Sequence, residues 1–413
     1  MTQGAAEQTR TPPTAEVPWT PRLLALAVAA AVAVSVIYIP QSLLTDVAAD
    51  LGVTPGAAGL VATAVQAGYA LGILLLVPLA DRVHPRRQVT VQSVLLAGAL
   101  ALSAVLPTVA AVVAGFAVVG LVANIAQVII PAAGRLAPPE RRGTTTATIV
   151  GSLSVGIFGG RILASLVVET TGWRWVAVGF ALLVLATVPF TRRALRDAAV
   201  PAEAGTSYPR LLLDTLALVR RSPELGQSAL LQFFVFATFN SAWTVMVLHL
   251  TAEPFGWSVR TAGLFGLVGL AAGLTTPLSG RLVDRFGTLP VAGGALAVML
   301  LAMASVVVDA DRLVPFALSM FAATAAGQLH QSAHQNRVLA IDPARAAQAN
   351  TVFMFFVFLG GSAGAFLGPA AYAAGGMARV GLVCCGLLVL ALVAWAAVSR
   401  QDRRAARERL TSS

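Results

Sequence analysis

The stretch Pro78-Leu79-Ala80-Asp81-Arg82-Val83-His84-Pro85-Arg86-Arg87 has a counterpart later in the chain, Gly280-Arg281-Leu282-Val283-Asp284-Arg285-Phe286-Gly287. Each copy closes the second apolar stretch of its half of the sequence. A pattern that recurs at this distance, inside a chain that is otherwise almost entirely apolar, indicates two copies of one multi-helix unit. Fused membrane repeats that move against each other are a general architecture of secondary transporters. The repeat therefore bears on both the fold and the class of function.

The composition excludes a water-soluble fold. Hydrophobic residues make up 57% of the chain, charged residues make up 11%, and the mean hydropathy is +0.80, whereas soluble domains carry about 25% charged residues. A helix needs about 20 apolar residues to cross the hydrocarbon core. Stretches of that kind occur at 22–44, 57–80, 88–106, 108–132, 144–168, 173–191, 226–250, 260–282, 289–308, 313–336, 348–373 and 377–398. Their composition, without alternation of polar and apolar residues, favours helices over barrel strands.

These stretches predict an all-α integral membrane protein with two six-helix bundles, at 22–191 and 226–398. Residues 1–21 are expected to form a disordered tail, and residues 399–413 a basic tail. The connecting segment 192–225 contains Tyr208–Arg221, in which apolar residues recur at helical spacing. That spacing predicts an amphipathic helix lying on the membrane face.

The basic residues indicate the orientation of the chain in the membrane. All 28 are arginines. If residue 1 is cytoplasmic and each stretch crosses once, only Arg174, Arg260, Arg312 and Arg379 lie outside and Arg161 lies within a span. This asymmetry follows the positive-inside rule and predicts that both termini are cytoplasmic. We therefore interpret the net charge of +10 as a topology signal and a set of lipid contacts rather than as a nucleic-acid site.

The two copies resemble the signature of the major facilitator superfamily, Gly-x-x-x-Asp-Arg-x-Gly-Arg-Arg between the second and third helices. The first copy matches at Asp81, Arg82, Arg86 and Arg87, and the second at Gly280, Asp284, Arg285 and Gly287. The first has Val77 and His84 where the family usually has glycine. The segments 38–53 and 138–143 are similar to a bacterial branch of drug and metabolite exporters. The resemblance covers residues 22–398 and implies twelve transmembrane helices, as two bundles related by pseudo-two-fold symmetry, in a bacterial cytoplasmic membrane.

The resemblance also implies that Asp81 and Asp284 hold the cytoplasmic side closed in one state of the transport cycle. An acid at a helix end has a physical reason to do so, because it can approach the positive N-terminus of a facing helix or pair with a loop arginine. The alternative is that these residues are loop charges that only fix the topology.

Arg161 is the most unusual single residue, because an arginine at the centre of a membrane helix costs about 2.5–3.5 kcal/mol on insertion scales. It follows Gly151, Gly156 and Gly160, which we expect to let helices approach closely. Asp46, at the outer end of the first span, lies at a similar expected depth. An ion pair between Asp46 and Arg161 near an outer gate is one hypothesis. The other is that Arg161 only packs, with its guanidinium bound to backbone carbonyls or extended toward the membrane surface.

The tenth span carries two sets of polar residues on nearly opposite faces. Gln328, Gln331 and Gln335 share one face, and His330 and His334 share the other. Helices one, four, seven and ten line the central cavity in the family, so we expect the glutamine face to look into it. The histidines are candidates for proton coupling because an unperturbed histidine titrates near pH 6.5. Structural packing is the alternative, and a metal site is not expected because no third ligand is near.

The same family assignment gives further candidates for the cavity wall: Tyr38, Gln41, Asn124, Gln127, Phe236, Asn240, Trp243, His249 and Asn350. This mixture of uncharged amides and aromatic rings suits a neutral or weakly cationic amphipathic molecule. A phosphate-type substrate would require several converging arginines, and the spans contain only one.

The leading prediction is a secondary transporter that exports small organic molecules by alternating access, driven by protons and without another cofactor. The partners expected are the small-molecule substrate and membrane lipids, and the expected state is a monomer. A sugar or amino-acid importer of the same fold is the alternative. A membrane enzyme or sensor is disfavoured because no acid lies near the middle of a span and no extramembrane module is present.

Overall fold

The computed structural model describes residues 19–199, 207–342 and 345–411. Side chains are described up to residue 402, except for that of residue 277. The disordered tail expected at 1–21 therefore lies outside the described residues except for its last three positions, which belong to a helix. Within the described ranges the chain is almost entirely helical and contains no strand. The basic tail expected from residue 399 continues the last helix, which ends at Thr411.

The first half consists of helices that correspond to the first six predicted spans. They are α1 (Trp19–Ser35), η1 (Ile39–Ser42), α2 (Leu44–Leu51), α3 (Pro55–Leu76), η2 (Val77–Asp81), α4 (Pro85–Ser103), α5 (Val109–Val122), α6 (Ile125–Leu136), η3 (Pro139–Arg141), α7 (Arg142–Thr171) and α8 (Trp173–Ala194). Thr54 and Thr108 begin α3 and α5 because each hydroxyl accepts a backbone N–H of the first turn.

The linker and the second half follow the same plan. They consist of α9 (Tyr208–Arg221), α10 (Pro223–Thr244), α11 (Met246–Thr251), α12 (Val259–Leu264), α13 (Gly266–Gly273), α14 (Pro277–Phe286), α15 (Thr288–Asp309), α16 (Leu313–Ile341) and α17 (Ala346–Thr411). The long α17 contains two predicted spans, since Gly375 and Gly376 have non-helical backbone angles and bend it there.

Each of the twelve predicted stretches is helical, but several are interrupted. The first breaks between α1 and α2, the fourth at Ala123–Asn124, and the eighth between α12, α13 and α14. By length and composition, eight helical segments of the described chain can cross a membrane. The number is nine if the helices on either side of residues 274–277, which are bent relative to each other, form one span. The described residues thus support the predicted all-α membrane fold, while eight or nine of the twelve predicted spans meet this criterion of length and composition. Broken spans are tolerated where neighbouring helices satisfy the freed backbone groups.

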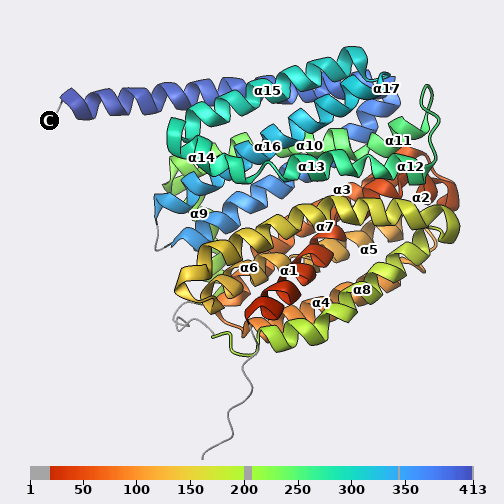
Figure 1. The fold of residues 1–413 in the computed structure, drawn as a ribbon, viewed down its shortest axis with the longest axis horizontal. Coiled ribbons are helices and arrows are strands. Elements are labelled where there is room, and N and C mark those ends of the chain that lie inside the picture. Colours follow the sequence, from red (N-terminus) through yellow and green to blue (C-terminus); the bar gives the residue numbers. More distant parts are fainter. Residues whose placement is uncertain (1–18, 200–206, 343–344, 412–413) are drawn as a thin grey trace, which may run out of the picture.

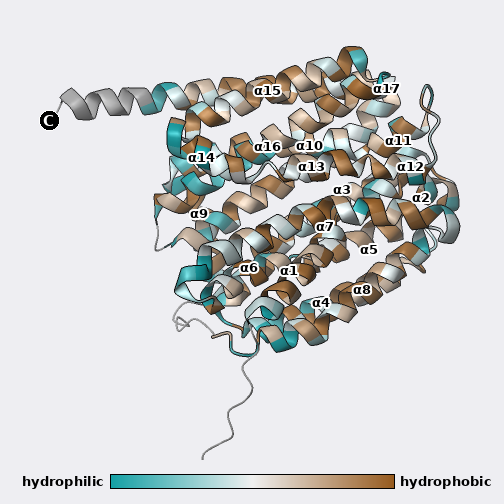
Figure 2. Cartoon of the chain, in the orientation of Figure 1, coloured by the Kyte–Doolittle hydropathy of each residue, from teal (hydrophilic) through white to brown (hydrophobic). Residues whose placement is uncertain are grey.

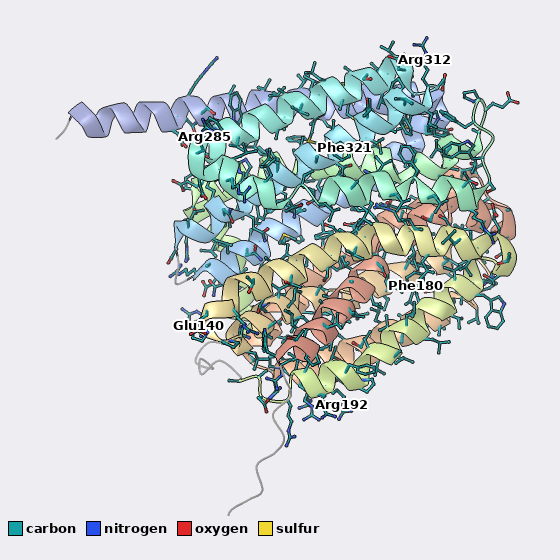
Figure 3. The ribbon with its side chains drawn as sticks, in the orientation of Figure 1. Glu140, Phe180, Arg192, Arg285, Arg312 and Phe321 are labelled. Atoms are coloured by element: carbon teal, nitrogen blue, oxygen red, sulfur yellow. The ribbon has the colours of Figure 1, made fainter. Side chains whose placement is uncertain are left out.

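The two halves lie side by side, with α1–α8 on one side and α10–α17 on the other (Figure 1). We call the end that carries Asp81 and Asp284 the motif end and the end that carries α2 and α11 the distal end. Figure 2 shows that the helices between these ends are mainly hydrophobic and that hydrophilic residues gather toward the ends. Leu301 is 72% exposed, which suits a lipid environment. Arg285, Glu140 and Arg192 lie toward the motif end and Arg312 at the distal end (Figure 3).

Two seams join the halves. In one, α7 packs on α12 and α13, where a methyl group added to Gly269 would come within 2.1 Å of Phe158. In the other, α3 packs on α17, where the Ser362 hydroxyl donates to the Thr63 carbonyl at 3.1 Å and the rings of Tyr69 and Phe358 lie 4.3 Å apart. Small residues permit this close approach of helices.

Candidate functional site

A cavity of about 1050 Å³ lies between the two halves. Its volume reaches the upper end of the range usual for small-molecule sites, about 300–1,000 Å³. It takes lining residues from both halves and from α9.

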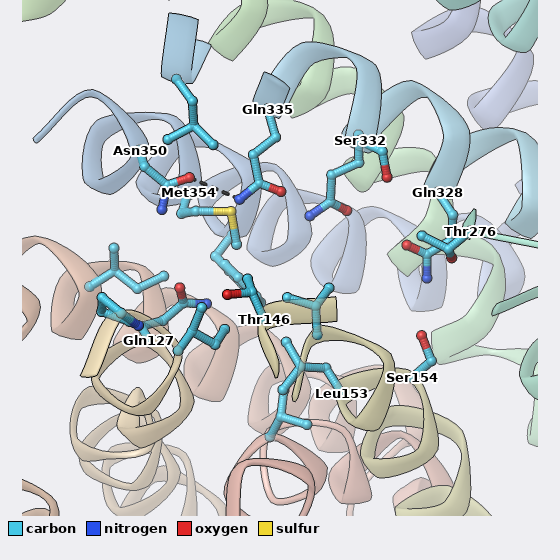
Figure 4. A pocket seen from close by; sticks show the side chains of 18 of the residues that line it. Gln127, Thr146, Leu153, Ser154, Thr276, Gln328, Ser332, Gln335, Asn350 and Met354 are labelled. Carbon is cyan, nitrogen blue, oxygen red and sulfur yellow. Dashed lines mark hydrogen bonds between the residues drawn. The ribbon is translucent and has the colours of Figure 1, made fainter. Parts of the chain in front are cut away.

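One wall is the polar face of α16. Gln328, Gln331 and Gln335 line the cavity together with Ser332, as the family resemblance implied for the tenth span. Figure 4 shows Gln328, Ser332 and Gln335 in succession along this helix. The Gln335 amide donates to Asn350 Oδ1 on α17 at 2.9 Å, so this pair forms one polar edge of the wall.

The opposite wall belongs to the first half and is less polar. Gln127, Thr146 and Ser154 face the α16 wall across the cavity (Figure 4). Tyr38 and Phe236 line the deep part, as the family assignment implied. The interior is therefore uncharged, with amides, hydroxyls and aromatic rings set among aliphatic side chains such as Val150, Leu153 and Met354.

The charged lining residues lie at the motif end. They are Asp81 at the end of η2, Arg135 in the last turn of α6 and Arg142 at the start of α7. The linker helix α9 contributes Leu211 and Thr215 to the same opening. The cavity thus reaches the motif end and passes between charged side chains there.

Beyond the deep end, a group that we call the distal plug closes the cavity: Gln41, Phe158, Arg161, Asn240 and Trp243. These side chains are at most 1% exposed. Gln41 Nε2 donates to Asn240 Oδ1 at 3.0 Å and joins the two halves. Arg161 donates from Nε to Gln41 Oε1 at 3.1 Å and from Nη2 to the same oxygen.

Four aromatic rings surround the Arg161 guanidinium. Its central carbon lies 4.6 Å from the ring centre of Tyr38, and 5.3, 5.4 and 5.8 Å from those of Trp243, Phe158 and Phe239. Such contacts are worth from about 0.5 kcal/mol when exposed to about 2 kcal/mol when desolvated. The arginine is therefore held by an amide oxygen and by ring faces rather than by a carboxylate.

Comparison with known proteins agrees with this architecture. The family model described as Major Facilitator Superfamily matches residues 24–335 and 228–412. The chain belongs to the major facilitator superfamily. A probable transporter of Streptomyces coelicolor is 34% identical over 84% of this chain and 80% of the relative.

Two more distant relatives have names that specify a drug. A chloramphenicol resistance protein of Streptomyces lividans is 30% identical over 60% of this chain and 63% of its own. A chloramphenicol efflux pump of Mycobacterium tuberculosis is 26% identical over 65% of each. Among solved structures, a D323A mutant of the nucleoside transporter NupG matches with a TM-score of 0.71 at 16% identity, over 91% of this chain and 99% of its own. The chain is thus a multi-pass membrane transporter of the major facilitator superfamily.

The two copies of the superfamily signature differ in local structure. In the first, η2 ends at Asp81 and the His84 ring accepts the Arg86 backbone N–H at 3.1 Å to begin α4. In the second, α14 continues to Phe286 and Gly287 follows at φ = +83°, a value that favours glycine. His84 has φ = −55°, so the first copy needs no glycine at that position.

The arginines of the signature have different surroundings. Arg82 lies over the Tyr208 ring at 5.7 Å, and the Tyr208 hydroxyl donates to the Leu75 carbonyl. Burial raises the pKa of Tyr208 while the charge of Arg82 lowers it. Arg285 lies over the Phe286 ring at 5.1 Å.

A methyl group added to Gly280 would meet nothing within 4 Å, so no close packing requires that glycine. Arg87 lies in the first turn of α4.

The ion pair between Asp46 and Arg161 is not formed in this structure. Asp46 Oδ2 instead accepts the Trp173 backbone N–H at 2.6 Å, at the N-terminus of α8. A helix N-terminus attracts a carboxylate, and Arg161 is already bound to Gln41. Burial raises the pKa of Asp46, the Trp173 N–H lowers it, and the nearby Asp50 carboxylate raises it.

Several residues expected on the cavity wall lie elsewhere. Gln41, Asn240 and Trp243 belong to the distal plug, where Trp243 Nε1 donates to Thr324 Oγ1 at 3.0 Å. Asn124 is buried at the break between α5 and α6, and it accepts from Gln92 Nε2 at 2.9 Å. His249 bonds to the Ala310 carbonyl at 2.9 Å near the distal end.

Gly151 does not have the packing role that we expected for all three glycines. A methyl group added there meets nothing within 4 Å, because Gly151 lines the cavity. Gly156 and Gly160 do pack closely, since a methyl group would come within 2.2 Å of the Ala31 carbonyl and 2.4 Å of Ser35 Cβ. Both contacts are with α1 and its C-terminal end.

His330 and His334 are fully buried and do not line the cavity. His330 Nδ1 bonds to Gln232 Oε1 at 2.6 Å, and Gln232 itself does line the cavity. Other lining residues that the sequence reasoning missed are Tyr69, Thr146, Ser154, Gln232, Ser332 and Phe358. Ser332 was accessible from the sequence, since it follows Gln328 by one helical turn.

Proposed function

We propose that this chain is a secondary active exporter that moves neutral or weakly cationic amphipathic molecules across a bacterial cytoplasmic membrane, in exchange for protons. The observation that carries the proposal is the cavity, whose interior is uncharged and whose charged residues are confined to one opening. An anionic substrate would require converging positive charges in the interior. The chloramphenicol resistance and efflux proteins among the relatives support a drug-like neutral substrate.

The motif end is cytoplasmic in this proposal, with both termini on that side. The distribution of arginine supports it, because the loops at the motif end are far richer in arginine than those at the distal end. The structure then represents an inward-facing state. Substrate enters between α6, α7 and α9 and binds between the glutamine face of α16 and the wall formed by Gln127, Thr146 and Ser154.

Export requires the distal plug to open while the motif end closes. Opening breaks the Gln41–Asn240 hydrogen bond, the direct amide link between the halves in the plug. It also separates Arg161 from the Trp243 and Phe239 rings, while Gln41 and Tyr38 move with Arg161 in the first half. One hydrogen bond contributes about 0.5–1.5 kcal/mol and each cation–π contact up to about 2 kcal/mol. The sum is a few kcal/mol, which suits an equilibrium between two conformations. Asp81 and Asp284 stabilise the closed motif end in the outward-facing state.

Proteoliposomes that contain the purified protein test the proposal with radiolabelled chloramphenicol as the probe. Protein inserted with its motif end outward should accumulate chloramphenicol inside when the lumen is acidic. A protonophore should abolish the accumulation. Accumulation that survives the protonophore would contradict proton coupling, and accumulation of sugars or amino acids instead would favour a nutrient transporter. Cysteines introduced at exposed Arg220 and Arg312 and labelled from one side determine the orientation, because only the motif-end position should react from the cytoplasm.

A further inference from the structure

A second polar region lies inside the second half, behind the cavity wall. It contains buried side-chain atoms that have no hydrogen-bond partner among the described residues: Gln232 Nε2, Ser228 Oγ, His330 Nε2, both ring nitrogens of His334 and Arg337 Nη1. A buried polar group without a partner costs about 1–3 kcal/mol. Such a group is normally satisfied by internal water, which needs two to four polar partners. This cluster supplies them.

The cluster extends from the cavity toward the motif end. Gln232 lines the cavity and bonds through Oε1 to His330 Nδ1 at 2.6 Å. The rings of His330 and His334 lie 4.5 Å apart between centres. Arg337 follows His334 by three residues and bonds through Nη2 to Gln227 at 3.3 Å and to Asp402 at 3.4 Å. Asp402 is exposed, so the chain of polar groups ends at the surface.

The depth of these residues along the two helices agrees. His330 precedes the end of α16 at Ile341 by 11 residues, which is about 16 Å at 1.5 Å per residue. Gln232 follows the start of α10 at Pro223 by nine residues, which is about 14 Å. Ser228 lies one turn before Gln232 on the same helix. The path therefore runs parallel to the cavity rather than through it.

We propose that His330 and His334 form a hydrated proton relay between the cavity, at Gln232, and the motif-end surface, at Arg337 and Asp402. The proposal rests on proton-coupled export and gives protons a route to the cytoplasm that is separate from the route of the substrate. Substrate uses the opening between the halves, and protons pass within the second half.

The hydrogen bond to Gln232 determines which ring nitrogen of His330 takes up the proton. Because Gln232 Oε1 accepts, His330 carries its proton on Nδ1 and presents a lone pair on Nε2. A proton from the cavity binds Nε2, leaves the same atom to water, and binds a ring nitrogen of His334. It then passes to water beside Arg337 and Asp402. One proton enters, one proton leaves, and both rings return to the neutral form.

The ionisable surroundings of the pair are sparse. Arg337, on the same helix, is the charged group within electrostatic reach of His334, and Asp402 of α17 accompanies it. From α10, the facing groups are the neutral Gln227, Ser228 and Gln232. Three other helices pack against α16. Of these, α13 has no ionisable residue and α15 has only Asp309, at the distal end. The third, α14, has Arg281, Asp284 and Arg285 at the motif end. Along the second span of α17, Arg379, Cys384 and Cys385 lie toward the distal end, before Trp395.

The first experiment needs no substrate. The chain has four histidines, so ¹⁵N-histidine NMR of the protein in nanodiscs resolves them, with His330→Gln and His334→Gln as assignment variants. A hydrated pair should exchange its ring N–H protons with D₂O within minutes. Ring protons of both histidines that persist for hours would indicate dry packing and overturn the relay.

The second experiment measures proton flux with a pH dye inside proteoliposomes while chloramphenicol moves down its own gradient. The double variant His330→Gln/His334→Gln should carry chloramphenicol with at least a tenfold smaller proton flux. His249→Gln is the matched control, because a glutamine amide can still donate to the Ala310 carbonyl, and it should couple as the wild type does. Full coupling in the double variant would overturn the relay and leave proton-coupled export standing. Wild-type transport without protons would refute both. If the wild type carries no chloramphenicol, the proposed substrate fails and the NMR exchange decides the relay.

Discussion

The two ends of the cavity are built from the same pair of halves but differ in how their polar groups are used. At the motif end, Asp81, Arg135 and Arg142 line an opening. At the distal end, Gln41, Arg161 and Asn240 are bonded to one another and buried. Polarity alone therefore does not separate an open end from a closed one. What distinguishes the distal end is that its polar groups hydrogen-bond to one another across the interface between the halves.

The same contrast appears along a single helix. Gly151 of α7 borders open space, whereas Gly156 and Gly160 touch α1 and its end. On the facing α12 and α13, Gly263, Gly266 and Gly269 approach α7 closely. The halves are thus in contact over the distal part of α7 and separate toward its start. A rocking motion that reverses this pattern must open the glycine contacts between α7 and α12–α13.

The largest effect is expected from locking the distal end. A Cβ atom added to Gly266 would lie 2.8 Å from Ile162 Cγ1. Ile162 Cβ is not among the three atoms nearest to it, and the third of these lies at 3.4 Å, so the two Cβ atoms are at least that far apart. Adding one C–C bond of about 1.5 Å places the two Cβ atoms within about 4.3 Å, which suits a disulfide. In a Cys384→Ala/Cys385→Ala background, oxidation of Ile162→Cys/Gly266→Cys should abolish transport in proteoliposomes.

Reduction should restore that transport, and each single cysteine variant should be insensitive to oxidant. Mass spectrometry of the digested protein verifies the cross-link. Undiminished turnover by the cross-linked protein would mean that the distal end does not open at this seam.

The second effect separates transport from stability. Arg161→Met removes a buried cation whose insertion costs about 2.5–3.5 kcal/mol, and also removes charged hydrogen bonds worth about 1.5–3 kcal/mol each together with the ring contacts. These terms oppose each other, so the free energy of unfolding should fall by less than the lost hydrogen bonds and ring contacts alone would imply. Transport should fall at least about tenfold because the plug loses its central group. A variant with normal turnover would show that Arg161 only packs.

Much of the fold was accessible from the sequence, because apolar length and the repeated motif report on membrane spans directly. The break at Asn124 was not, since it sits in an apolar stretch without a strong local interruption. The segment 36–43 does carry a signal, because it contains Pro40, and proline disfavours a helix interior. Their geometry depends on neighbouring helices, such as the Gln92 amide that bonds to Asn124.

The site was predictable where one helix determines it. The spacing of Gln328, Gln331 and Gln335 places them on one face, and that face lines the cavity. Prediction failed where two elements meet. Asp46 was matched to Arg161 by its expected depth in the membrane. Depth does not reveal that the Gln41 amide binds Arg161, or that the N-terminus of α8 binds the Asp46 carboxylate.

A smaller effect is expected from paired substitutions on α7. Gly156→Ala places a methyl group within 2.2 Å of the Ala31 carbonyl, and overpacking of this kind costs about 1–3 kcal/mol. Gly151→Ala meets open space and should leave the melting temperature unchanged or slightly higher, since alanine favours a helix by about 1 kcal/mol over glycine. Thermal unfolding of both variants in detergent makes the comparison. Equal melting temperatures would contradict the assigned packing.

The smallest effect belongs to the charges at the opening. Arg135→Gln and Arg142→Gln remove positive charges that border the path of the substrate, and exposed charges at such distances contribute about 0.2–1 kcal/mol. The KM for a cationic probe such as ethidium should fall by about twofold to fivefold, while the KM for neutral chloramphenicol should not change. Because salt screens exposed charges over about 8 Å at physiological ionic strength, the difference should shrink as salt is raised. An equal change for both probes would indicate a structural perturbation of the opening and not an electrostatic one.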